Sequence, residues 1–138
     1  MRQRSNRSYV WSHEPYTRYS KKADAMRFKP AKSANAILHR FDSDVEFRRW
    51  HELRLLEQAG EIHDLKVHTK FLLGQHTKTY WESDFDYKDP VEKKRIVEDA
   101  KGWNRKKNKP IIQPATKVKH KWFRENYHTT HKLIITTA

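Results

Sequence analysis

The strongest structural signal in this 138-residue chain is an amphipathic segment with helix signals at both ends. Ser43 is a typical helix N-cap, and Glu46, three residues later, completes a capping box. Apolar residues then recur at helical spacing on one face: Trp50, Leu53 and Leu56. Gly60 can end the helix, because glycine readily adopts the left-handed backbone of a helix C-terminus. The pattern predicts a helix over residues 43–59.

Alternating apolar and polar residues after this helix predict three strands. The first two cover residues 65–73 and 78–87, and Gly74-Gln75-His76 between them is typical of a hairpin turn. The third strand covers residues 95–101. Because all three follow a helix closely, the segment has the pattern of a small α/β domain.

The rest of the chain adds a loop, a helix and a strand. Residues 102–114 are rich in Lys, Asn and Pro and predict a loop. Residues 116–127 predict a helix, and a last short strand covers residues 132–137. The inner side of this second helix is expected to consist of Val118, Trp122 and Phe123. The predicted order is therefore αβββαβ.

The charged residues are distributed unevenly along the chain. The formal net charge is +13, yet residues 41–101 hold 11 Lys and Arg against 14 Asp and Glu, a net charge of −3. Residues 1–40 and residues 102–138 each carry a net charge of +8. This basic excess favours a nucleic-acid partner over an anionic membrane, and the acidic centre is suited to metal-assisted chemistry on a polyanion.

Residues 1–35 are predicted to form a basic, partly disordered arm ahead of a domain at 36–138. They mix Arg, Lys and Ser with aromatic residues, and neither a helical nor a strand period holds across them. Such an arm can contact phosphates through its cations and stack bases on its aromatic rings. A solvated tail without a binding role explains the same composition.

Two short motifs place acids and a lysine on neighbouring predicted strands. Strand alternation puts Asp84 and Asp86 on one face of the second strand, and Asp99 and Lys101 on one face of the third. If the strands pair, Asp84 and Asp99 converge on one divalent cation, for which oxygen ligands favour Mg²⁺ or Mn²⁺. Lys101 can then position the attacking water or neutralise charge on the phosphate. Solvated surface acids are the alternative.

Glu46 is a candidate third acid. It lies near the middle of the apolar arc of the first helix, where an unpaired carboxylate is costly. Either its capping role or a metal site explains this position, and the two are compatible because a carboxylate has two oxygens.

Histidines and lysines outside these motifs give weaker signals. His120, His128 and His131 lack convincing zinc spacing, and without cysteine the chain has no thiolate ligands or disulfides. The candidate phosphate contacts are five lysines: Lys106, Lys107, Lys117, Lys119 and Lys121.

Several segments in order resemble a family of small phage and prophage proteins in the PD-(D/E)xK nuclease superfamily, related to archaeal-type Holliday-junction resolvases. The resemblance covers roughly residues 38–136. The matching segments are Phe41-Asp42-Ser43-Asp44-Val45-Glu46, residues 52–62, Ser83-Asp84-Phe85, Val97-Glu98-Asp99-Ala100-Lys101-Gly102 and residues 117–127. Ser83 stands where the superfamily name has Pro, and the segment 102–114 looks longer than usual.

The resemblance implies an α/β fold with the restriction-endonuclease-like αβββαβ core. It also implies metal binding by Glu46, Asp84 and Asp99, with Lys101 as a catalytic residue, and it favours Asp84 over Asp86. We therefore expect a Mg²⁺-dependent, structure-selective endonuclease for branched DNA, acting as a homodimer in the host cytoplasm.

Two other functions fit the same sequence. One is a non-catalytic DNA-binding protein on this fold, in which the acids serve stability. The other is a basic structural or RNA-binding phage protein that acts through its arm. A membrane protein is not expected, because no run of ~18 apolar residues occurs.

Overall fold

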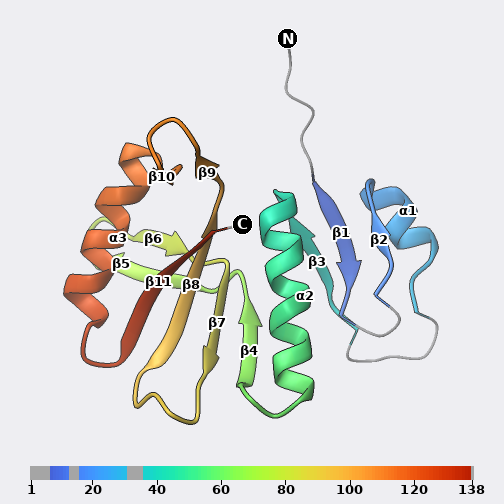
Figure 1. Cartoon of the computed structure of the whole chain (residues 1–138), viewed down its shortest axis with the longest axis horizontal. Coiled ribbons are helices and arrows are strands. Elements are labelled where there is room, and N and C mark those ends of the chain that lie inside the picture. The colour runs from blue at the N-terminus through green and yellow to red at the C-terminus, as the bar shows by residue number, and fades with distance from the viewer. Residues whose placement is uncertain (1–6, 13–15, 31–35, 138) are drawn as a thin grey trace. The chain divides into compact units, whose positions relative to one another are not determined.

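The computed structural model describes residues 7–12, 16–30 and 36–137. It has a mixed α/β fold, which agrees with the predicted class, and it divides into two compact units, Met1–Arg48 and Arg49–Ala138 (Figure 1). We describe each unit by itself.

The N-terminal unit contains a three-stranded antiparallel sheet with the order β2-β1-β3. Its strands are β1 (Ser8–Trp11), β2 (Arg18–Tyr19) and β3 (Leu38–Phe41), and the short helix α1 (Lys22–Arg27) follows β2. The indole N–H of Trp11 donates a hydrogen bond to the carbonyl of Ala25, 2.9 Å away, and joins α1 to β1.

Within the predicted partly disordered arm, residues 8–11, 18–19 and 22–27 have regular structure that no sequence period indicated. The physical reason is the shortness of β1 and β2 and the distance in sequence between β1 and its partner β3. Such pairing leaves no local period to detect. The parts of the predicted arm at 1–6, 13–15 and 31–35 lie outside the described residues.

Helix α2 (Asp44–Gln58) confirms the first predicted helix. The Ser43 hydroxyl accepts the backbone N–H of Glu46 at 3.2 Å, as an N-cap does. One oxygen of Glu46 in turn accepts the backbone N–H of Asp42 at 3.3 Å. Gly60 has the left-handed φ of +77° expected just past the helix end.

The C-terminal unit is built on a four-stranded sheet with the order β11-β8-β7-β4. Its strands are β4 (His63–Val67), β7 (Phe85–Lys88), β8 (Arg95–Lys101) and β11 (His131–Thr137). Strand β11 runs parallel to β8, and the other neighbouring pairs are antiparallel. The third and last predicted strands thus correspond to β8 and β11.

The first two predicted strands are each divided into two. Strands β5 (Lys70–Gly74) and β6 (Thr79–Glu82) form a separate two-stranded sheet. The break before β5 coincides with His68, whose φ of +56° turns the backbone out of the extended conformation. The backbone N–H of His68 donates to the carbonyl of Asp84 at 3.0 Å, so the two breaks lie side by side.

Helix α3 (Pro114–Tyr127) packs on the hydrophobic core of this unit. Its buried side chains are His120 and Phe123, whereas Val118 is 64% exposed. The predicted inner side was therefore wrong at Val118, because the apolar stripe is centred on Phe123. The buried core residues around Phe123 are Phe71, Leu73, Trp81 and Val97.

A short hairpin occupies most of the predicted loop at 102–114. Strands β9 (Trp103–Asn104) and β10 (Lys109–Pro110) pair antiparallel, in register Trp103 to Pro110. The hairpin continues the chain from the end of β8 and leads into the N-terminus of α3 (Figure 1).

Candidate metal and catalytic site

The structure brings Asp84 and Asp99 together. Asp84 lies at the break between β6 and β7, where its backbone N–H donates to the carbonyl of Glu98 at 3.1 Å. Its carboxylate accepts the backbone N–H of Ala100 at 2.7 Å. Because Phe85 pairs with Glu98, Asp84 lies across from Asp99 on β8, close enough to lower the pKa of Asp99. The two acids that were expected to converge are therefore neighbours.

Lys101 lies beside Asp99, as strand alternation predicts. The Lys101 ammonium nitrogen Nζ is 3.3 Å from the Asp99 oxygen Oδ1. The Lys101 side chain is partly exposed, whereas Asp99 is buried. The ammonium group thus faces both Asp99 and solvent, and a phosphate approaching from solvent would meet it.

His120 is a member of this site that the sequence reasoning missed. Its Nε2 atom lies 2.5 Å from Oδ2 of Asp99, and its ring is buried against Trp81 with 5.3 Å between ring centroids. The sequence signal was its position three residues before Phe123, which puts both side chains on the inner face of α3.

These contacts determine the charge state of Asp99. Burial by itself raises the pKa of Asp99, since it disfavours the charged carboxylate. The hydrogen bonds with His120 and Asp84 and the positive charge of Lys101 act in the opposite direction and lower the pKa below its usual value. Asp99 is therefore ionised at neutral pH despite its burial.

His68 is a second residue that the sequence reasoning missed. A ring nitrogen of His68 and a carboxylate oxygen of Asp84 lie within 4.8 Å of each other. A continuous strand over residues 65–73 would have directed His68 away from the apolar face. Its left-handed backbone breaks this alternation, and a non-glycine residue gives no sequence signal for such a conformation.

Glu46 belongs to the N-terminal unit, in the first turn of α2. It is buried, and one of its oxygens accepts the N–H of Asp42. The capping alternative considered for Glu46 is thus observed.

The carboxylates of Asp86 and Glu98 bind other residues of the fold. Asp86 is buried and accepts hydrogen bonds from the Thr69 hydroxyl and from Nε of Arg95. Glu98 is completely buried and binds the guanidinium of Arg49, with 2.9 Å between Nε and Oε1. Both acids have strong partners within the fold, which leaves Asp84 and Asp99 as the acidic pair beside Lys101.

The lysines predicted to contact phosphates do not share one face. Lys117 and Lys121 are exposed on α3, but Lys119 is partly buried and its ammonium donates to the backbone carbonyl of Tyr80 at 3.2 Å. At about 100° per residue, Lys119 projects nearly opposite to the other two. The expectation of a common outer face is therefore wrong for Lys119. Lys106 and Lys107 are exposed in the turn of the β9–β10 hairpin.

Comparisons with family models, with curated proteins and with solved structures found no match to this chain. Among the residues that the structure describes, none of the helices has the length and apolar character needed to cross a membrane.

Proposed function

We propose that this protein is a Mg²⁺- or Mn²⁺-dependent endonuclease of the PD-(D/E)xK type that acts on branched DNA. The observation that carries the proposal is the position of Asp84 across from Asp99, with its carboxylate on the N–H of Ala100 and with Lys101 Nζ 3.3 Å from Asp99. Two adjacent carboxylates can hold a divalent cation, and an ammonium group beside them can stabilise charge that develops on a phosphate.

The chemistry of the acidic pair fits a hard divalent cation. Two neighbouring carboxylates repel each other when both are ionised, unless a proton or a cation lies between them. Oxygen ligands suit Mg²⁺, and Mn²⁺ also accepts an imidazole nitrogen such as that of His68. A bound ion would polarise the scissile phosphate and favour ionisation of the attacking water.

We assign Asp84 and Asp99 as candidate ligands, with His68 beside Asp84 as a further one. For Glu46, the role of metal ligand stays a prediction that rests on the resemblance in sequence.

The other residues of the site have supporting roles. His120 holds Oδ2 of Asp99 and directs its second oxygen outward, toward Lys101 and the substrate. The Lys101 ammonium has three hydrogens, so it can donate to a phosphate oxygen while it contacts Asp99. It would thereby stabilise the negative charge that develops on the phosphate during attack.

Basic residues of the C-terminal unit would bind the DNA backbone. Residues 102–124 contain no Asp or Glu, and four exposed basic side chains recur along one side of α3 and its C-cap. These are Lys117, Lys121, Arg124 and His128. We further propose a homodimer, because two symmetric incisions of a four-way junction require two active sites.

A non-catalytic DNA-binding protein on this fold is the second candidate. One observation favours it: both oxygens of Asp99 already have partners, His120 and Lys101. Asp99 is thus satisfied without a metal ion, and the two acids could serve stability alone.

A cleavage assay separates the two functions. A labelled four-way junction, a flap and a linear duplex are incubated with Mg²⁺, Mn²⁺ or EDTA, and binding is measured in parallel. The endonuclease cuts the branched substrates only with metal, and Asp99→Asn abolishes cutting without weakening binding. Glu82→Gln, an exposed acid on β6, is the matched control and retains cutting. Tight binding with no cleavage under any condition would establish the second function instead.

A further inference from the structure

The β9–β10 hairpin has a turn that is held in one conformation. Its backbone pairing extends to the N–H of Ile111, which donates to the carbonyl of Gly102 at 2.8 Å. Within the turn, the side-chain oxygen of Asn104 accepts the backbone N–H of Lys107 at 3.1 Å. Asn108 adopts a left-handed φ of +49°, which asparagine tolerates better than most residues. The hairpin therefore presents its side chains from a defined scaffold.

Trp103 is a large aromatic residue on the surface of this hairpin. Its exposed fraction is 41%, although burial of an indole normally contributes strongly to stability. Ile111, at the base of the hairpin, is exposed as well. An exposed indole is suited to stacking because each nucleobase has a π face of similar size.

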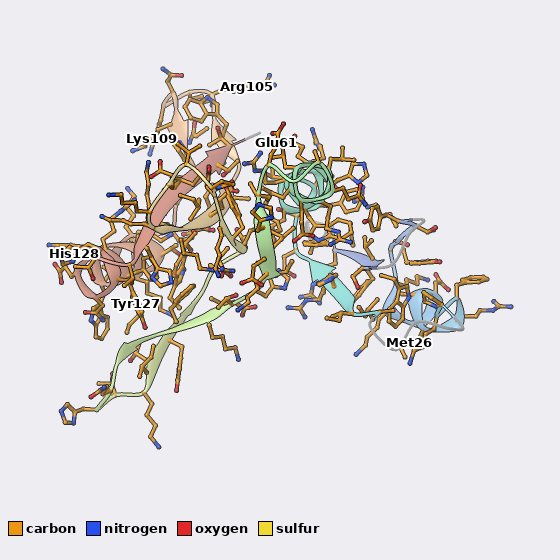
Figure 2. All side chains as sticks on the ribbon, turned by 90° about the horizontal axis from the view of Figure 1, so that it is seen from below. Met26, Glu61, Arg105, Lys109, Tyr127 and His128 are labelled. Atoms are coloured by element: carbon orange, nitrogen blue, oxygen red, sulfur yellow. The ribbon has the colours of Figure 1, made fainter. Side chains whose placement is uncertain are left out.

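The hairpin that carries Trp103 is basic, and residues 102–111 contain no Asp or Glu. The exposed basic residues of the hairpin are Arg105, Lys106, Lys107 and Lys109. Figure 2 shows Arg105 and Lys109 on the hairpin, apart from His128 at the other end of α3. A stacking ring flanked by cations is the arrangement with which proteins bind unpaired nucleotides.

We propose that the β9–β10 hairpin is a binding site for unpaired nucleotides of a DNA strand, with Trp103 stacked on a base and Arg105, Lys106 and Lys107 at the phosphates. In an intact duplex the bases are already stacked on each other, so an indole gains this contact only where a strand is single or splayed apart. The site would therefore select the unpaired part of a branched substrate.

The position of the hairpin links this site to the proposed cleavage. Trp103 follows Lys101 by two residues, a separation of about 7 Å at most along the backbone. A strand with one phosphate at Lys101 would thus bring a neighbouring nucleotide to Trp103. The inference rests on the proposed function in this respect, and it explains how such a nuclease would favour branched DNA.

Binding measurements with Asp99→Asn protein test the site without cleavage. The probes are a single-stranded oligothymidine, a flap with the same single-stranded segment, and a blunt duplex. Added to this background, Trp103→Ala is expected to weaken oligothymidine binding by about 5- to 150-fold, the range for loss of one base–aromatic stack. Duplex binding should change by less than about twofold, since it depends on phosphate contacts.

Two further variants distinguish loss of the stacking contact from a general loss of structure. Trp103→Phe retains an aromatic ring and should restore oligothymidine binding to within about threefold. Tyr80→Ala removes an aromatic side chain that is 48% exposed on β6 and should leave all three affinities unchanged. Equal weakening of single-strand and duplex binding by Trp103→Ala, or no weakening at all, would overturn the proposal.

Cleavage by the unmodified protein is measured separately. If no substrate is cut but Trp103→Ala still loses single-strand binding selectively, the endonuclease is wrong and the stacking site stands. If branched DNA is cut and Trp103→Ala changes no affinity, the endonuclease stands and the stacking site is wrong.

Discussion

His120 and Asp99 form a buried pair in which the imidazole Nε2 lies 2.5 Å from the carboxylate Oδ2. The pair joins α3 to the central strand β8 and leaves Oδ1 of Asp99 beside the ammonium group of Lys101. A metal-binding carboxylate is commonly oriented by such an outer partner, and loss of the partner typically costs 10–100-fold in metal affinity or activity.

We expect His120→Ala to reduce the cleavage rate by about 10- to 100-fold and to raise the Mg²⁺ concentration needed for half-maximal cleavage. His120→Gln should retain more activity, since its amide N–H can occupy the place of the Nε2 hydrogen. The measurement is a Mg²⁺ titration of cleavage beside a thermal unfolding curve. Lower stability with an unchanged Mg²⁺ requirement would show that His120 acts only in the fold.

His131 makes the stability of the fold depend on pH. Burial lowers the pKa of His131, and the positive charge of Arg95 lowers it further, while Asp86 opposes the shift. The folded protein therefore disfavours protonated His131, whereas the unfolded chain protonates it at the ordinary pKa of 6.5. The stabilisation is present above that pH and is lost as the pH falls below it.

His131→Phe should remove this pH dependence and keep the ring contacts with Phe71 and Tyr127. We expect the free energy of unfolding of the unmodified protein to fall between pH 7.5 and pH 5.5 more steeply than that of the variant. Denaturant titrations at several pH values measure the difference. His76→Asn, an exposed residue of the β5–β6 turn, is the control and should follow the unmodified protein.

Removal of Arg49 and removal of Glu98 from their buried ion pair should destabilise the fold to different extents. Glu98 is 0% exposed, whereas the Arg49 side chain is 22% exposed and also contacts Glu52. Arg49→Met leaves the Glu98 carboxylate in the core with the Thr136 hydroxyl but without its cation, and should lower the free energy of unfolding by about 3–5 kcal/mol. Glu98→Gln leaves a partly solvated guanidinium with its second partner and should cost clearly less.

Arg54→Met is the matched control for Arg49 on the same helix. Arg54 pairs with Glu57 one turn later, and both side chains are partly exposed. Its loss should cost about 0.5 kcal/mol or less. Equal destabilisation by Arg49→Met and Arg54→Met, measured by urea unfolding, would contradict a special role of the buried pair.

Local signals made part of the fold predictable from sequence. Ser43 and Gly60 marked the ends of α2 because caps depend on residues next to the helix. The position of Asp84 across from Asp99 followed from strand alternation and the pairing of neighbouring strands. Both inferences needed only short-range geometry.

The missed features depend on non-local or backbone effects. Strand β1 pairs with β3 through contacts such as Ser8 to Phe41, which no local period indicates. His68 breaks a strand through a left-handed backbone that is unusual for a residue other than glycine. His120 was missed because the apolar stripe of α3 was centred on the wrong residues, and an error of one residue rotates a helical face by about 100°.

The lysines of α3 should contribute differently to the salt dependence of DNA binding. Lys117 and Lys121 are exposed on one side of the helix, while Lys119 donates to the Tyr80 carbonyl on another side. Each phosphate contact adds about 0.9 to the slope of log binding constant against log salt concentration. Replacing both Lys117 and Lys121 with Ala should therefore reduce the slope by about 2 and weaken binding most at low salt. Lys119→Ala removes one positive charge, as Lys117→Ala or Lys121→Ala does alone, but should change the slope far less than either. Equal effects of the three single substitutions would contradict a DNA-binding face on this side of α3.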